Sequence, residues 1–432
     1  MAEHTHTDTG EASTVRRLLP TTRSQVSGHR FMRRRVEHGL IYGDIRMIHD
    51  PLAARRRSAI FGVVAVALIA AGSGLFAWLR PNPDPGEAAI LRATDGAMYV
   101  RVGEEVHPVT NLTSARLIAG VAEEPQRVGD ERLTAMQRGV PLGIATAPSM
   151  FAPGDAEDAA WSACQDTTGR LTIAAGAMPG ELKGNEGVVV KLDADEWLLT
   201  REGRAKLPPA DDAQGRVIRR ALGLNAQVPR LAIDAAALTT FRELPPIKLP
   251  NPLPQLLIAD NAGGDKAWVL TPHGGLQAVT ELQKNMLIDA GVTPRNVTTS
   301  QVAAYPDADV PLAIDVPDTA PEWVDLDGKA VCSTESGTAA VVGTDVLAQG
   351  AIELSGASPA SHFVGLSDGA VGIDTGAGYH VVSASGQRHF VDTRENLDVV
   401  GAQHIEQVPW SLISLLPEGP ELTREAALTA TY

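Results

Sequence analysis

The sequence of 432 residues is short of cysteine, lysine and aromatic side chains. It contains two cysteines and seven lysines, and Phe, Trp and Tyr together make up 4% of the chain. The two cysteines lie in no Cys-x-x-Cys or Cys/His spacing, which excludes the usual zinc and dithiol redox motifs. Because aromatic residues are few, we expect hydrophobic cores built from Val, Leu, Ile and Ala.

One long stretch of the chain carries no charge. From Ser58 to Leu79 there are 22 consecutive uncharged and mostly apolar residues. As a helix they would span about 33 Å, enough for a hydrocarbon core of about 30 Å. A cleaved signal peptide would have a shorter apolar run and fewer residues before it. Residues 58–79 therefore predict a transmembrane helix.

The charges that flank this stretch predict its direction. Residues 1–57 carry eleven Arg against six acidic residues, a net +5, so the whole-chain charge of −15 leaves −20 for residues 58–432. Arg55, Arg56 and Arg57 adjoin the apolar run, and the positive-inside rule places the N-terminus in the cytoplasm. An acidic domain outside the membrane argues against nucleic-acid or anionic-lipid binding.

Both cysteines, Cys164 and Cys332, fall in the external part of this topology. In an oxidising compartment an isolated pair favours one disulfide, and the alternative is two buried free thiols. The closed loop would hold about 170 residues, for which the chain-entropy model gives roughly 5 kcal/mol as an upper estimate.

One pattern recurs four times outside the predicted membrane helix. An aromatic residue opens a β-like run, Gly and then Val or Leu follow, and a helical stretch comes next. The pattern predicts a β-hairpin turned at Gly and covered by a short helix that starts at a Thr or Asp cap; chance similarity is the alternative. The four copies lie at residues 99–118, 197–223, 268–288 and 379–400.

The remaining external segments predict two related halves. Residues 244–254 hold five prolines in eleven residues and predict an extended strap with two copies on either side. The predicted fold is α+β: a cytoplasmic helix, one transmembrane helix, then an elongated β-rich domain of four small hairpin and helix repeats around a central β domain, in two pseudo-symmetric halves with one disulfide. The predicted segments are 1–57 cytoplasmic, 58–79 transmembrane, 80–127 first repeat, 128–180 first segment of the central β domain, 181–243 second repeat, 244–256 strap, 257–302 third repeat, 303–350 second segment of the central β domain, 351–405 fourth repeat, and 406–432 tail.

The Arg-rich N-terminal segment predicts one amphipathic helix over about 22–42. Thr22 and Gln25 have the spacing of a capping box. Val26, Met32, Val36 and Leu40 then fall near one face, and four arginines and a histidine occupy the rest. The segment is interpreted either as a basic topogenic stretch on anionic headgroups or as a docking helix for another membrane subunit.

No motif for catalysis is complete. A phosphate-binding loop requires Gly-x-x-x-x-Gly-Lys-Ser/Thr, and the nearest cluster, residues 180–187, is acidic and lacks the Lys-Ser/Thr end. Residues 365–369 match Gly-x-Ser-x-Gly, but a short Gly-rich run follows where a hydrolase has a helix. Residues 325–328 are better interpreted as a β-turn than as a calcium loop. The histidines, such as His273 and His380, show no ligand pair, and we predict no catalytic, cofactor or metal site.

Several blocks resemble the EccB family, a membrane component of type VII (ESX) secretion systems of mycobacteria and related actinobacteria. The most specific block is Gln25–Asp44, with the sequence QVSGHRFMRRRVEHGLIYGD. Asp50-Pro-Leu, Asn111–Leu117, the cysteine pair and the ending Val408–Pro420 extend the resemblance over almost the whole chain. The chain departs from the family in its short tail after Pro420.

The resemblance implies a structural subunit of the bacterial inner membrane. EccB-type proteins assemble with EccC, EccD and EccE, associate with the mycosin protease, and self-associate in the periplasm. The cytoplasmic helix would contact neighbouring subunits; the residues implied are Val26, Arg30, Phe31, Met32, Arg33, Arg34, Arg35, Val36, Leu40 and Tyr42.

We therefore expect a scaffold subunit that links the cytoplasmic and periplasmic parts of the secretion complex. One alternative is a membrane-anchored module that binds the cell wall, suggested by the four repeats. A second alternative is an ATP hydrolase, a label sometimes given to the family, for which the sequence offers no residues.

Overall fold

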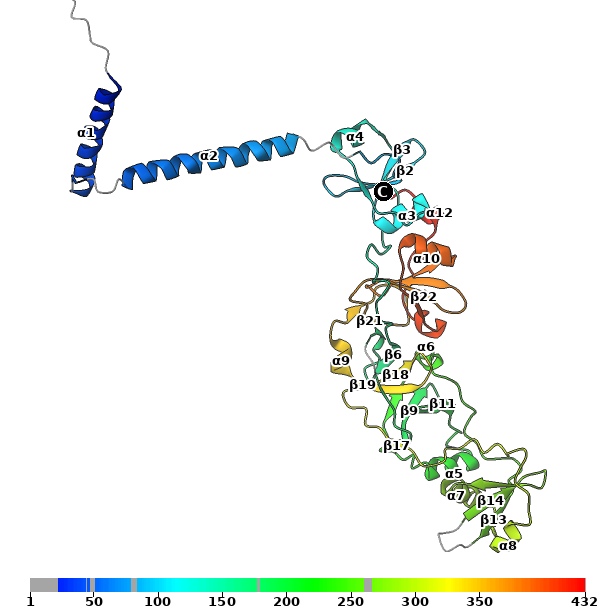
Figure 1. Ribbon diagram of the computed structural model, residues 1–432. Coiled ribbons are helices and arrows are strands. Elements are labelled where there is room, and N and C mark those ends of the chain that lie inside the picture. Colours follow the sequence, from blue (N-terminus) through cyan, green and yellow to red (C-terminus); the bar gives the residue numbers. More distant parts are fainter. Residues whose placement is uncertain are drawn as a thin grey trace, which may run out of the picture. The chain divides into compact units, whose positions relative to one another are not determined.

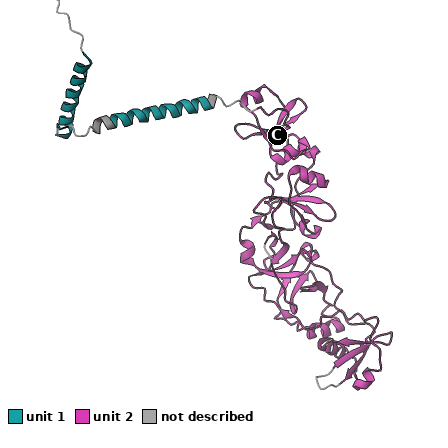
Figure 2. Cartoon of the chain, viewed as in Figure 1, with its two compact units in different colours: residues 1–82 teal, residues 83–432 magenta. Residues whose placement is uncertain are grey.

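The computed structural model describes residues 22–43, 45–46, 51–78, 84–176, 179–259 and 266–431. The chain divides into two compact units, residues 1–82 and 83–432 (Figure 2). The first unit contains helix α1 (Arg23–Tyr42) and helix α2 (Pro51–Trp78). Leu79, the predicted end of the membrane helix, lies outside the described residues.

The second unit is rich in β-sheet (Figure 1), and four of its sheets share one connectivity. In each, three antiparallel strands are followed by a helix and then by a short strand that pairs in parallel with the first strand. The helix is part of the connection between the third strand and the short strand, and this connection returns the chain to the side of the first strand.

The first and second of these sheets lie in the N-terminal half of the unit. The first contains β1 (Ile90–Arg92), β2 (Met98–Val102), β3 (Glu105–Val109), α3 (Leu112–Ala119) and β4 (Gln126–Arg127), and continues through α4 (Asp130–Ala135) to β5 (Gln137–Arg138) beside β3. The second contains β9 (Glu186–Leu192), β10 (Asp195–Thr200), β11 (Gly203–Lys206), α5 (Ala213–Ala221) and β12 (Arg230–Ala232), with α6 (Ala235–Thr239) after it and β17 (Glu322–Trp323) also beside β9.

The third and fourth sheets lie further along the chain. The third contains β13 (Gln255–Ala259), β14 (Lys266–Leu270), β15 (Leu276–Val279), α7 (Glu281–Asp289) and β16 (Arg295–Asn296), followed by α8 (Thr299–Val302). The fourth contains β22 (Val371–Asp374), β23 (Tyr379–Val382), β24 (Arg388–Val391), α10 (Arg394–Val400) and β25 (Ile405–Gln407), followed by α11 (Trp410–Ile413) and α12 (Arg424–Ala427).

A polar side chain caps the helix of each of these sheets at its N-terminus. Asn111, Asp212, Thr280 and Thr393 each accept a hydrogen bond from a backbone N–H in the first helical turn. These bonds satisfy donors that the helix itself leaves unpaired. The expected Thr or Asp caps are thus present in three helices, and the first helix uses Asn.

The helices pack in pairs that differ from the halves expected from sequence order. Helix α3 contacts α10 and α12, and the buried residues of the first and fourth sheets form one cluster. Helix α5 contacts α7, and the second and third sheets share another cluster. Each of these helices therefore packs against the helix of a sheet in the other half of the unit.

A seven-stranded sheet contains the disulfide. Its order is β20-β21-β7-β6-β18-β19-β8. The strands are β6 (Trp161–Asp166), β7 (Leu171–Ala175), β8 (Gly180–Glu181), β18 (Lys329–Thr334), β19 (Ala339–Gly343), β20 (Ile352–Glu353) and β21 (His362–Gly365), with α9 (Thr344–Ala348) after β19. Cys164 of β6 and Cys332 of β18 face each other across the antiparallel pair and are bonded, as predicted from the isolated pair.

Two segments predicted from the sequence, the strap and the fourth repeat, can be compared with the structure. Residues 244–254 form no helix and no regular strand, the chain bends at residues 251 and 252, and the apolar residues Ile247 and Leu249 are buried. Residues 351–405 do not form a single sheet, because β20 and β21 pair into the seven-stranded sheet while β22 to β25 form their own. The division falls at Gly365, whose φ of 121° ends β21.

Candidate functional site

Helix α1 is the first candidate site because its apolar side chains are exposed and no other part of the described chain packs against them. Thr22 and Gln25 form the predicted capping box, and Gly43 ends the helix in the left-handed conformation. Met32, Val36 and Leu40 follow one another at intervals of four residues and therefore share a face. The ten side chains predicted for subunit docking are all exposed, and Leu40 is the most exposed of the large apolar ones among them, at 81%.

The same helix carries positive charge beside this apolar row. Arg30, Arg33, Arg34 and Arg35 are exposed, and the Arg33 guanidinium lies 2.9 Å from the carboxylate of Glu37 one turn on. An exposed pair of this kind contributes little to stability. The helix thus presents arginines and apolar side chains together, which suits a protein partner or the surface of an anionic membrane.

Helix α2 provides a candidate membrane span. Among the described residues, one segment, Arg55–Phe76, is long and apolar enough to cross a membrane, and none of it is buried inside the protein. Arg55, Arg56 and Arg57 stand at its N-terminal end. A helix that is apolar on all sides and unburied has no stable place in water, so its length and composition fit a bilayer.

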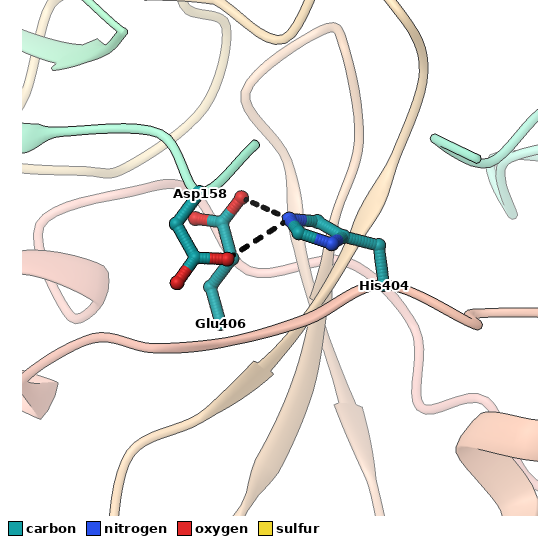
Figure 3. Close-up of side chains that lie close together, drawn as sticks. All are labelled: Asp158, His404 and Glu406. Carbon is teal, nitrogen blue, oxygen red and sulfur yellow. Dashed lines mark hydrogen bonds and ion pairs between the residues drawn. The ribbon is translucent and has the colours of Figure 1, made fainter. Parts of the chain in front are cut away.

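Asp158, His404 and Glu406 form a polar cluster in the second unit (Figure 3). His404 Nε2 lies 3.0 Å from Glu406 Oε1 and 3.4 Å from Asp158 Oδ1. Glu406 and His404 are buried, at 3% and 7% exposure, whereas Asp158 is exposed. The indole N–H of Trp161 and the backbone N–H of Ala159 also donate to the Glu406 carboxylate.

This cluster was not predicted from the sequence. His404 and Glu406 are two residues apart at strand β25, so their side chains lie on the same face. That His-x-Glu spacing was a usable signal. Asp158 lies in the irregular segment before β6, far from His404 in the sequence. Its position beside His404 could therefore not be inferred from residue spacing.

Two buried histidines lie on neighbouring strands of the fourth sheet. His380 of β23 stacks on Trp410 with ring centroids 5.1 Å apart, and burial lowers its pKa, with a further contribution from Arg388. His389 of β24 is hydrogen-bonded through Nδ1 to the carbonyl of Pro420, at 2.9 Å, and burial lowers its pKa as well. Both rings are thereby favoured in the neutral form.

The motifs that suggested catalysis lie in turns. Ser367 is exposed in the turn between β21 and β22, and a strand follows it where a hydrolase needs a helix. Lys183, in the Gly/Lys cluster, makes an exposed pair with Glu186. Asp325 accepts a hydrogen bond from the N–H of Asp327 in the turn before β18. Each segment is therefore an ordinary connection between strands.

These features define a class of protein. An Arg-rich helix with uncovered apolar side chains precedes one helix of membrane-spanning length, and a large sheet-rich unit with a buried disulfide follows. Such a chain is suited to be anchored in a membrane and to assemble with other proteins.

Comparison with known proteins identifies the family. The family model described as "Type VII secretion system ESX-1, transport TM domain B" matches residues 18–431. The chain is 32% identical to the "ESX-3 secretion system ATPase EccB3" of Mycolicibacterium smegmatis, over 95% of this chain and 90% of that protein. It is 27% identical to the "ESX-1 secretion system ATPase EccB1" of Mycobacterium tuberculosis, with 95% of both chains covered. The chain belongs to the EccB family of type VII secretion systems, as the N-terminal block predicted.

Solved structures agree with this assignment. A chain of an intact ESX-5 inner membrane complex superposes with a TM-score of 0.66 at 25% identity, covering 95% of this chain and 96% of that one. A chain of an EccB3 dimer from the ESX-3 core complex gives a TM-score of 0.66 at 25% identity and covers 79% of this chain and 100% of that one.

Proposed function

We propose that this chain is a structural subunit of an inner-membrane type VII secretion complex, in which it links the cytoplasmic and periplasmic parts. The observation that carries the proposal is the match over 95% of the chain to a component of an intact ESX-5 inner membrane complex. The unburied apolar segment Arg55–Phe76 supplies the anchor.

Gene deletion and complementation test this proposal. Deletion of the gene is expected to stop secretion by one type VII system and to remove its large membrane complex from native gels. Both are restored by the wild-type chain. Normal secretion and an intact complex in the deletion strain would contradict the proposal.

The orientation is part of the proposal. Arg55, Arg56 and Arg57 support a cytoplasmic N-terminus and a periplasmic second unit, because basic residues next to a span are retained inside. Alkaline phosphatase fused after the last residue is then expected to be active. A fusion before α1 is expected to be inactive, and the reverse result would overturn the orientation.

We propose that α1 docks the chain onto neighbouring membrane subunits, with EccC, EccD and EccE as the expected partners. Exposed Met32, Val36 and Leu40 support a protein contact. Replacing Met32 and Val36 by Glu is expected to release these subunits during purification. The matched control, Ser24→Glu with Ser27→Glu, adds the same charge away from this row and is expected to retain them. Release by both variants would indicate a charge effect on membrane binding.

The four sheets of shared connectivity support the proposal that the periplasmic part is built from four repeats. The pairing of the first sheet with the fourth, and of the second with the third, makes the chain run outward and return, so that α12 contacts α3. A region closed in this way suits a spacer between the membrane and periplasmic partners, which we propose to be the mycosin protease and further EccB copies.

The proposal is for a subunit without its own catalytic role. Relatives carry the name ATPase, but this sequence has no Gly-x-x-x-x-Gly-Lys-Ser/Thr string and the nearest cluster forms a strand connection. Purified protein is therefore expected to hydrolyse no ATP above a mock preparation.

The cell-wall-binding alternative rests on the repeats alone, and no feature of the described residues favours it.

A further inference from the structure

The cluster of Asp158, His404 and Glu406 joins two parts of the second unit. Asp158 precedes β6 of the seven-stranded sheet, whereas His404 and Glu406 belong to the edge strand β25 of the fourth sheet and the residue before it. The segment before β6 already contacts the chain at the start of the fourth sheet, because the N–H of Ala152 donates to the carbonyl of Ala370, the residue before β22, at 2.9 Å. An interaction that links the three side chains would strengthen the contact between the segment before β6 and the fourth sheet.

The three side chains have the spacing of ligands to one metal ion. Tetrahedral bonds of about 2.05 Å place neighbouring ligand atoms about 3.3 Å apart. His404 Nε2 lies 3.0 Å from Glu406 Oε1 and 3.4 Å from Asp158 Oδ1, and the three ligand atoms lie within 4.8 Å of one another. All three face a common point in Figure 3. An ion could therefore replace the hydrogen bond between His404 Nε2 and Glu406 Oε1.

The surroundings hold the ligands in place. The Trp161 indole N–H donates to Glu406 Oε2, and the Ala159 N–H reaches Oε1 at 3.2 Å, which leaves one lone pair of Oε1 facing His404. Outer hydrogen bonds of this type orient metal ligands and are important for affinity. Asp158 is 75% exposed, so an ion could enter from its side and keep a water in the fourth position.

We infer that Asp158, His404 and Glu406 bind a divalent transition-metal ion, Zn²⁺ by preference, which clips the segment before β6 to strand β25. One imidazole with two carboxylates suits Zn²⁺, whereas Ca²⁺ and Mg²⁺ require oxygen ligands in larger number. The inference does not depend on membership of a secretion complex.

Metal titration of the full-length chain, purified in mild detergent without a polyhistidine tag and stripped with chelator, tests the inference. Calorimetry is expected to show one Zn²⁺ per chain with a Kd of about 10 μM or tighter, and no comparable binding of Ca²⁺ or Mg²⁺. Asp158→Ala, at an exposed position, is expected to weaken binding at least about tenfold. His404→Gln, which keeps a donor for Glu406, is expected to abolish it, along with the visible absorption of a Co²⁺-loaded sample.

Glu157→Ala is the matched control, since Glu157 is an exposed carboxylate next to Asp158 and outside the cluster. It is expected to bind Zn²⁺ as the wild type does. Absence of binding at about 100-fold the expected Kd, or unchanged binding in both Asp158→Ala and His404→Gln, would overturn the inference. The second outcome would place the ion elsewhere on the chain.

Discussion

Removal of the disulfide between Cys164 and Cys332 is expected to lower the free energy of unfolding of the second unit. The bond closes a loop with a sequence separation of 168 residues. In the chain-entropy model, a loop of that length restricts the unfolded state by about 5 kcal/mol at 25 °C, and measured losses usually fall in the range of about 2–5 kcal/mol. The loss is thus a large fraction of the stability of a typical domain, which is about 5–15 kcal/mol.

The folded state should survive this change. Strands β6 and β18 are paired over five residues, from Ala330 opposite Asp166 to Thr334 opposite Ser162. That antiparallel ladder and the buried sheet around it do not require the covalent bond. The double variant Cys164→Ala/Cys332→Ala is therefore expected to fold and to keep its circular dichroism spectrum.

Urea unfolding of the full-length protein, followed by tryptophan fluorescence, measures the loss. Buried Trp161 lies in β6, so it reports on this sheet. The wild type in the presence of a reductant is the control, because it loses the bond and retains both sulfur atoms. We expect both samples to lose about 2–5 kcal/mol. A loss below about 0.5 kcal/mol in both would refute the reasoning, since the unfolded chain would then be unrestricted by the bond.

Three further predictions concern single residues of the second unit. Gly365→Ala is expected to cost more than about 2 kcal/mol, because the new Cβ would clash with the carbonyl oxygen of Ala175, whereas Gly184→Ala meets open space and should be nearly neutral in thermal unfolding. Burial lowers the pKa of His389 below its ordinary value of about 6.5, so its contribution to stability is complete above that pH and is lost as the pH falls through the folded-state pKa. His389→Gln should flatten this dependence in unfolding curves measured from about pH 5 to 8, and an unchanged slope would contradict it. Leu397→Ala, at a fully buried position of α10, should cost about 2–5 kcal/mol and expose α3 to hydrogen exchange; unchanged protection of α3 would argue against the pairing of these helices.

Much of the local structure was predictable because short-range chemistry determines it. The Thr22–Gln25 capping box marks the start of α1, and the uncharged run marks α2. The isolated cysteine pair implied the disulfide. In each case the relevant signal is contained in a few neighbouring residues, or in the absence of any other partner.

The arrangement of the sheets was harder to predict because it depends on contacts between distant segments. The closing strands, such as Gln126–Arg127 and Arg295–Asn296, are two residues long and exposed, so they have no hydrophobic period. The pairing of α3 with α10 depends on tertiary burial, which sequence order does not encode. Asp158 likewise meets His404 only because the segment before β6 lies against the fourth sheet.

The most direct test of the central claim is purification of the tagged full-length chain in mild detergent, with native sizing and identification of what accompanies it. We expect recovery in a very large complex that contains EccC, EccD and EccE, and loss of those subunits with the Met32→Glu/Val36→Glu variant. Recovery of the chain alone, or with envelope polymer only, would contradict it.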